Sequence, residues 1–163
     1  MSDTADLAAL PSDADKQRLR LWLRLLKISR SIEAELRERL RITYKSTLPR
    51  FDVLAALFRE ETGLKMSELS AALMVSNGNV TGIIERLVGE GAVERIPIPD
   101  DRRAMRVRLT QKGRHDFTGM ARVHQNWISE LLAGIDAKDA AIICELFDTE
   151  LPILTPPLAG ENE

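Results

Sequence analysis

The sequence predicts a mainly α-helical fold with one small β-hairpin wing, and two observations support this fold class. Apolar residues recur at helical spacing through most of the chain, whereas alternation with a period of two is confined to the segments AVERIPIP and AMRVRLT. Directly before these strands, residues 75–91 form a helical segment that is polar at its N-terminal end and stops at a glycine. Such a polar tip fits a DNA major groove, and a basic hairpin beside it can reach the neighbouring backbone. We therefore predict a winged helix-turn-helix with long flanking dimerisation helices.

Length and composition fit one ordinary globular domain. The chain has 163 residues, of which 44% are hydrophobic and 29% charged, a balance that excludes a disordered chain. No run of 18 apolar residues occurs, so neither a membrane span nor a membrane partner is expected. The first residues, MSDTADLAALPSDAD, are acidic and lack the basic-then-apolar pattern of a signal peptide, so we expect a cytoplasmic protein.

Cysteine and histidine usage argues against a metal site. Cys144 is the single cysteine, which excludes a disulfide framework and a thiolate cluster, and its apolar neighbours predict a buried, unreactive thiol. His115 and His124 lie nine residues apart, a poor match to the i, i+4 spacing of a metal-binding pair on a helix. We expect neither a metal nor a cofactor.

Residues 1–14 are expected to form a flexible arm, and residues 15–46 an N-terminal dimerisation helix. The helix is predicted from about Asp15 to Thr43, with an apolar stripe made by Leu25, Ile32, Leu36 and Leu40. Its first half is apolar on further sides, through Leu19, Leu21, Trp22, Leu23, Leu26 and Ile28. A helix that must bury more than one face packs against a partner as well as its own domain. We expect this half to belong to a dimer interface.

Residues 47–110 are predicted to form a DNA-binding lobe. Thr47 can cap a helix that has Pro49 in its first turn and ends at Gly63. Ser67 is predicted to cap the next, short helix, and a turn through MVSNG leads into the helix NVTGIIERLVGEG, which stops at Gly91. The residues predicted to face inward are Phe51, Leu54, Leu57, Phe58, Leu69, Leu73, Val80, Ile83, Ile84 and Leu87.

Two strands and two helices are predicted to complete the chain. Residues 92–99 and 104–110 form the strands with Asp100 and Asp101 in the turn, and Pro97 and Pro99 mark the first as a short edge strand. Thr110 is expected to cap a helix over residues 111–134, and Asp136 a helix over residues 137–151. We assign residues 111–151 to C-terminal dimerisation helices and residues 152–163 to a tail.

Charge is distributed unevenly, although the net charge is only −2. Between Arg102 and Arg114 six residues are basic and none is acidic, whereas the stretch from Glu130 to Glu163 holds eight carboxylates and one lysine. A phosphate responds to charges within a Debye length of about 8–10 Å, so the local bias outweighs the sum. This favours nucleic acid as the partner of the hairpin, and we expect the acidic stretch to face away from it.

In this order, the elements resemble the MarR family of bacterial transcriptional regulators. SELSAALMVSNGNVTGIIERLVGEGAVER is similar to the family's two DNA-reading helices, and DDRRAMRVRLTQKGR to its Asp-x-Arg wing followed by LTxxG and a long helix. Recognisable motifs cover about residues 48–115, and the flanking helices match in length and order. The resemblance implies a homodimer in which the first and last helices of both subunits interlock.

Candidate DNA contacts gather at the start of the helix that precedes the hairpin. Small polar side chains there can hydrogen-bond base edges and phosphates with help from the helix dipole: Ser76, Asn77, Asn79 and Thr81. Gly82 would let the backbone approach closely, Arg86 should point toward phosphate, and Ser67 is a candidate phosphate contact in the preceding helix. The alternatives are helix capping by Ser67, Ser76 or Asn77, small-residue packing at Gly82, and an i, i+4 pair between Arg86 and Glu90.

In the hairpin, the resemblance implies that Asp101 holds Arg103 and so stabilises the wing, and Arg103 is counted with the DNA-binding residues. Arg102 is the candidate for insertion into the minor groove, where an arginine reads groove width. Arg106 and Arg108 are candidates for phosphate contacts. The alternative is a solvated basic turn.

An effector pocket lies, in this family, between the dimerisation helices and the DNA-binding lobe. By position, the resemblance implies walls that include Trp22, Leu26, Arg30, Phe51, Met120 and His124, for which ordinary core packing is the alternative. Cations on the first helix, such as Arg24 and Lys27, suggest an anionic ligand, and LRLWLRLLK is similar to members that sense aromatic acids or their coenzyme A (CoA) thioesters. The first helix begins without a cysteine, which argues against the peroxide-sensing mechanism of some relatives.

The residues and the resemblance together imply a homodimeric, ligand-responsive transcriptional regulator. We expect a repressor that leaves a pseudo-palindromic operator when a small aromatic or CoA-thioester effector binds. A winged-helix protein-interaction module that does not bind DNA is the alternative. An enzyme is not expected, because the sequence has no nucleophile elbow, phosphate loop or metal cluster.

Overall fold

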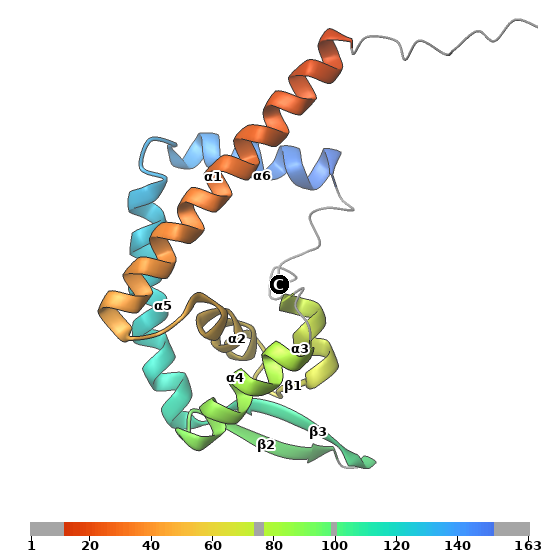
Figure 1. Cartoon of the computed structure of the whole chain (residues 1–163), viewed down its shortest axis with the longest axis vertical. Helices are drawn as coiled ribbons and strands as arrows, with labels where there is room; N and C mark the ends of the chain where they lie inside the picture. Colours follow the sequence, from red (N-terminus) through yellow and green to blue (C-terminus); the bar gives the residue numbers. More distant parts are fainter. Residues whose placement is uncertain (1–11, 74–76, 99–100, 152–163) are drawn as a thin grey trace, which may run out of the picture.

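The computed structural model describes residues 12–73, 77–98 and 101–151, with the backbone alone for residues 77 and 101–104. Its elements are α1 (Asp13–Tyr44), α2 (Leu48–Arg59), β1 (Leu64–Lys65), α3 (Met66–Leu73), α4 (Asn77–Gly89), β2 (Val93–Ile98), β3 (Asp101–Leu109), α5 (Gln111–Leu131) and α6 (Ala137–Glu150). Figure 1 shows α2, α3, α4 and the sheet gathered into a lobe, from which α1 projects as a long rod, while α5 leads from the sheet to α6. The predicted fold class, mainly α-helical with a β-hairpin wing, is confirmed.

Helix α1 begins earlier than the sequence analysis predicted. Ser12 caps it: the Ser12 side chain accepts a hydrogen bond from the Asp15 backbone nitrogen at 3.1 Å, and the Ser12 nitrogen donates to the Asp15 carboxylate at 3.2 Å. This reciprocal pair is a capping box, which satisfies two backbone donors at the helix start. The helix therefore begins two residues before the approximate start predicted at Asp15, so the last residues of the predicted arm are helical.

The lobe is built around one hydrophobic core. Its largest fully buried side chains come from α1, all three lobe helices and both hairpin strands: Leu40, Val53, Leu57, Leu69, Val80, Ile84, Leu87, Val93 and Val107. Of the residues predicted to face inward, Phe58, Leu73 and Ile83 are only half-buried at the rim, and the others are buried. The helical periodicity therefore identified the faces that hold α3 and α4 in place.

The sheet has three strands in the order β1-β3-β2, so it contains one more strand than predicted. β1 is only two residues long and pairs antiparallel with β3, placing Leu64 opposite Val107. A strand this short carries no period-2 signal in the sequence. Asp101, predicted in the turn, instead begins β3 and pairs with Ile98. Pro97 lies in β2, which is an edge strand, as expected of proline.

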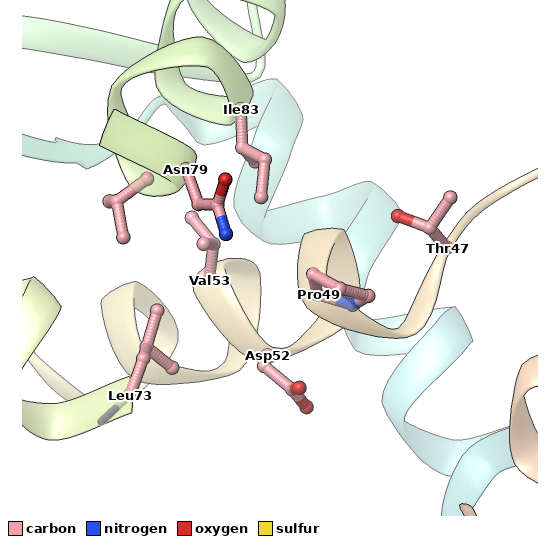
Figure 2. A pocket seen from close by; sticks show the side chains of 8 residues that line it. Thr47, Pro49, Asp52, Val53, Leu73, Asn79 and Ile83 are labelled. Atoms are coloured by element: carbon pink, nitrogen blue, oxygen red, sulfur yellow. The ribbon is translucent and has the colours of Figure 1, made fainter. Parts of the chain in front are cut away.

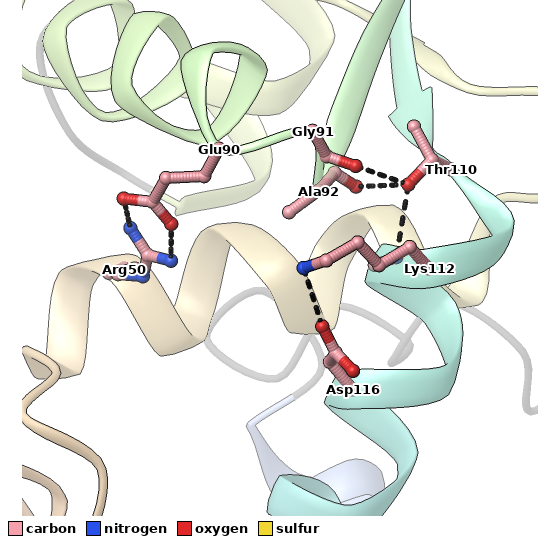
Figure 3. Close-up of polar contacts among 8 residues, drawn as sticks. Arg50, Glu90, Gly91, Ala92, Thr110, Lys112 and Asp116 are labelled. Carbon is pink, nitrogen blue, oxygen red and sulfur yellow. Dashed lines mark hydrogen bonds and ion pairs between the residues drawn. The ribbon is translucent and has the colours of Figure 1, made fainter.

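The junction between the hairpin and α5 is unusually close. The Thr110 side chain caps α5 by accepting from the Gly113 nitrogen at 3.0 Å, and it donates to the Gly91 carbonyl oxygen at 2.7 Å (Figure 3). The Thr110 nitrogen donates to the carbonyl oxygen of Ala92 at 3.0 Å. A Cβ at position 113 would lie 2.0 Å from that same oxygen, so this position requires glycine. Thr110 and Gly113 thus explain the LTxxG pattern in physical terms.

Three further predictions about single residues were wrong. Ser67 does not cap α3, because the helix already begins at Met66, and Ser67 is exposed in its first turn. Gly63 does not end α2, which stops at Arg59; Gly63 lies in the following turn with φ +82°. Cys144 is exposed rather than buried, because no residue of α6, which is described over its whole length, is buried in the protomer. Among the described helices, none has the length and apolar character needed to cross a membrane.

Candidate nucleic-acid interface

Helix α4 presents a polar surface on the side opposite its buried face. Val80, Ile84 and Leu87 are fully buried against the lobe. Asn79, Gly82 and Arg86, spaced three and four residues apart, are exposed and share one stripe of the helix, with the exposed Thr81 on the adjoining stripe. The predicted candidate residues of α4 whose side chains are described therefore all lie on its accessible side.

Gly82 has open space around it. A Cβ placed there would meet no atom within 4 Å, so internal packing among the described residues gives no reason for glycine. This argues against the alternative of small-residue packing. The position leaves the helix backbone uncovered at the centre of the polar stripe.

Arg50, not Arg86, is the ion-pair partner of Glu90. The Arg50 guanidinium makes two hydrogen bonds to the Glu90 carboxylate, one of them at 2.8 Å between Nη1 and Oε1, and so joins α2 to the residue that follows α4 (Figure 3). These hydrogen bonds hold the pKa of Glu90 below its ordinary value, with smaller contributions from the charges of Lys112 and Arg86. The alternative prediction for Arg86, an intrahelical ion pair with Glu90, was therefore wrong. Arg86 is exposed on α4.

Several basic residues of the 102–114 segment have structural partners. Arg108 donates to Glu94 across the hairpin at 2.7 Å, Lys112 contacts Asp116 at 2.9 Å, and Arg114 donates to the Phe58 carbonyl oxygen at 3.1 Å. The expectation that Arg108 adds a phosphate contact is therefore not supported by its position. The basic bias of the 102–114 segment overstated its free positive charge, because the carboxylates that pair with it, Glu94, Asp116 and Glu61, lie just outside or far from the segment.

Arg106 lies on β3 between Ile96 and Lys65 of the neighbouring strands. It is half-buried, and its Nε is buried without a hydrogen-bond partner among the described residues. Ser76 lies outside the described residues, and for Asn77, Asp101, Arg102 and Arg103 only the backbone is described. The Asp101–Arg103 contact and the minor-groove role of Arg102 stay predictions.

The six predicted effector-pocket residues do not form one pocket within the protomer. Phe51 and His124 line a cavity of about 530 Å³. Met120 lines a different depression beside Arg86, and Leu26 and Arg30 line a groove on α1 itself. Trp22 is 57% exposed. The reason is the length of α1: with a rise of about 1.5 Å per residue, Trp22 lies roughly 27 Å along the helix from the buried Leu40.

The cavity at Phe51 lies between α1, α2, α3 and α5. The rings of Phe51 and His124 are stacked, with centroids 4.2 Å apart and an interplanar angle of 23°, and the Phe117 ring also packs against Phe51, with centroids 5.3 Å apart. Burial lowers the pKa of His124, so the imidazole is neutral at pH 7. Asp52, which was not predicted as a site residue, also lines this cavity, and its pKa is raised by desolvation and by the charge of Glu33.

A second cavity, of about 510 Å³, lies between α2 and α4. Figure 2 shows Asn79 and Ile83 of α4 facing Val53 and Pro49 of α2 across it, whereas the Asp52 carboxylate points away to the opposite side of α2. Asn79 therefore lies both on the exposed stripe of α4 and at the edge of this cavity. The Arg50–Glu90 pair was also not predicted, since a single arginine in a helix has no local signal for a partner forty residues away.

Comparison with known proteins agrees with this geometry. The sequence pattern of the MarR family matches residues 46–105. The multiple antibiotic resistance protein MarR of Escherichia coli is 32% identical over 128 residues, covering 71% of this chain and 83% of that protein. The solved structure of a mutant of that MarR, complexed with operator DNA, matches with a TM-score of 0.69 and 29% identity, covering 86% of this chain and 100% of that chain.

Two further relatives match over shorter stretches of the chain. The HTH-type transcriptional regulator PecS of Dickeya dadantii is 36% identical over 72 residues, covering 43% of this chain. The transcriptional activatory protein BadR of Rhodopseudomonas palustris is 38% identical over 77 residues, covering 46% of this chain. The chain spans 43% and 44% of the lengths of these two relatives. The similarity to E. coli MarR over most of its length, together with the winged helix-turn-helix fold, shows that the chain belongs to the MarR family of transcriptional regulators, which are not enzymes.

Proposed function

We propose that this chain acts as a homodimeric, ligand-responsive transcriptional regulator that binds a pseudo-palindromic operator in double-stranded DNA. The observation that carries the proposal is the exposed stripe of Asn79, Gly82 and Arg86 on a helix whose opposite face is fixed in the lobe core. A helix of this kind can lie in the major groove, with the hairpin beside it over the neighbouring backbone. The solved complex of E. coli MarR with operator DNA supports this use of the fold.

Dimerisation is supported by apolar side chains that the protomer leaves uncovered. On α1 these are Leu19, Leu21, Trp22, Leu23 and Ile28, and on α6 they are Ile142, Ile143 and Leu146. Faces this apolar are costly in water and are typical of an interface. Two protomers joined through them would carry two α4 helices to half-sites about one helical turn of DNA apart. Analytical ultracentrifugation should give a dimer, and Leu146→Glu should shift it to the monomer.

The mode of regulation is proposed as repression relieved by an effector. The relatives differ in their names, since MarR is described as a repressor and BadR as an activatory protein. A ligand that favours a dimer whose α4 spacing does not fit the operator would release DNA, and a ~100-fold release needs about 2.7 kcal/mol of differential affinity. Transcription from the cognate promoter should rise when the chain is deleted; a fall would indicate activation.

The effector is proposed to be a small aromatic molecule in the Phe51–His124 cavity. Stacked rings at a cavity wall support an aromatic ligand. The aromatic acid or CoA thioester predicted from the sequence depends on the cations of α1. Lys27 and Arg30 are exposed and line the groove on α1, which would suit the phosphates of a CoA moiety, but this groove is separate from the cavity in the protomer.

Fluorescence polarisation with duplex DNA over a range of salt concentrations tests the proposal. A specific complex should weaken steeply with salt, with a log–log slope of about −0.9 for each phosphate contacted. Arg86→Ala should lower both affinity and slope, whereas Arg108→Ala, which removes a residue already paired with Glu94, should change neither substantially. A protein-interaction module would instead show no steep salt dependence, and that result would reject DNA binding.

A further inference from the structure

The Phe51–His124 cavity combines an apolar wall with a set of carboxylates. Its apolar lining comes from leucines and alanines of α1, α2 and α3, with Phe51 and His124 as the aromatic wall. Glu33 of α1, Asp52 of α2 and Glu60 also line it. The cation among the described lining residues is Arg59, so the cavity carries an excess of negative charge.

Asp52 is a lining carboxylate that has no counter-charge among the described residues and whose pKa is raised. Among the described residues it has no ion-pair or hydrogen-bond partner, whereas Glu33 lies 3.9 Å from Arg37 with both side chains 59% exposed. Two effects raise the pKa of Asp52: partial desolvation first, and then repulsion from Glu33. Both mean that the ionised carboxylate is less stable here than in water, and a cation beside it would relieve both.

The aromatic wall does not supply the missing positive charge. His124 is held neutral by burial, which lowers its pKa. Phe51 is only 6% exposed and packs against both His124 and Phe117, so the half-buried imidazole is the more accessible aromatic face of the cavity wall, and it carries no charge. Such faces attract the edge of another ring and also an ammonium group within about 6 Å. The carboxylates and the rings thus select for the same kind of ligand.

We propose that this cavity binds a small aromatic amine in its protonated form, with the ring against Phe51 and His124 and the ammonium group beside Asp52 and Glu33. The inference rests on the proposed function in one respect, since it takes this cavity to be the effector site. It differs from the sequence-based expectation of an acid, because the cations that suggested an acid lie along α1 outside the cavity. An aromatic carboxylate placed here would be repelled by Asp52 and Glu33, with Arg59 as the opposing cation among the described lining residues.

The test compares three probes with the same phenyl ring and similar length: phenethylamine as the cation, hydrocinnamate as the anion and phenethyl alcohol as the neutral form. Isothermal titration calorimetry on the full chain, without DNA, measures each affinity at pH 7. We expect phenethylamine to bind at least ~10-fold more tightly than hydrocinnamate, a difference of about 1.4 kcal/mol. Asp52→Asn, which keeps the shape of the side chain, should reduce that preference to near unity.

Two further variants keep the result interpretable. Glu33→Gln should reduce the preference partly and serves as a second reading if Asp52→Asn melts at a lower temperature. Glu61→Gln removes the same charge from the residue after Glu60 but outside the cavity lining, where the side chain is 83% exposed, and should leave the preference unchanged. Equal or tighter binding of hydrocinnamate, no binding of any probe, or a preference that survives both cavity variants would overturn the inference.

Duplex binding is measured separately in the polarisation assay described above. If the chain binds duplex DNA but prefers the anion, the proposed ligand class is rejected and the proposed regulator function stands. If the chain prefers the amine but does not bind duplex DNA, the proposed regulator function is rejected and the proposed amine-binding site stands.

Discussion

Arg50 and Glu90 connect the start of α2 to the end of α4 through a two-point ion pair, with side chains 27% and 50% exposed. The hydrophobic face of α4 fixes its rotation about its own axis, and this pair fixes its C-terminal end. The contact therefore positions the surface of Asn79 and Arg86 without belonging to it.

Arg50→Ala should lower affinity for duplex DNA while the salt slope stays close to that of the wild type, because no phosphate contact is lost. The stability loss should be small, about 0.5–1 kcal/mol, as for other partly exposed ion pairs. Urea unfolding and polarisation measure the two effects. Arg41→Ala, which breaks the exposed pair with Glu38 on α1, is the matched control and should leave DNA affinity unchanged.

The same pair predicts a dependence on pH. The pKa of Glu90 is lowered in the folded state, so the stabilisation is fully present above the unfolded pKa and is lost as pH falls through the folded pKa. Glu90→Gln should therefore remove part of the acid destabilisation seen in thermal melts. An unchanged acid limb in Glu90→Gln would contradict this.

Gly113→Ala should strongly destabilise the lobe. The added Cβ would lie 2.0 Å from the carbonyl oxygen of Ala92, and backbone atoms on both sides resist movement. We expect a loss of about 2–4 kcal/mol or failure to fold. Gly119→Ala on the same helix is the control, since a Cβ there meets nothing within 4 Å, and it should stabilise by about 0.5–1 kcal/mol through helix propensity.

Asp52→Asn should stabilise the chain at pH 7. Because the folded pKa of Asp52 is raised, stability is highest below its unfolded pKa and declines as pH rises through the folded pKa. The variant lacks this decline, so its advantage in melting temperature should be present at pH 7 and vanish near pH 3. An equal advantage at both pH values would point to packing rather than charge.

The parts of the fold that follow from local patterns could be predicted from the sequence. The period of the apolar residues identified the buried faces of α2 and α4, and Thr47, Thr110 and Asp136 were recognised as caps from their side-chain chemistry. β1 could not be predicted, because its two residues become a strand only through pairing with Val107 and Arg106.

The candidate site, like the fold, could be predicted where it follows from local patterns. The exposed positions of α4 follow from the helix period once its buried face is known. The neutralisation of Arg108 by Glu94 and the cavity around Asp52 depend on contacts between distant segments, which spacing along the chain does not encode. The predicted pocket residues do not come together in the protomer, because several of them lie far out along the 32-residue helix α1.

The Ala92 carbonyl group ties three elements together, because it ends the turn after α4, begins the hairpin and contacts the first turn of α5. A tilt of α5 would therefore move the hairpin and α4 together as one rigid unit. The short connection between α1 and α2 lies outside this unit, and within it Lys45 has a left-handed backbone with φ 51°. In the proposed dimer, substitutions in that connection should change the distance between the two α4 helices, while the contacts of each α4 with its own half-site stay the same.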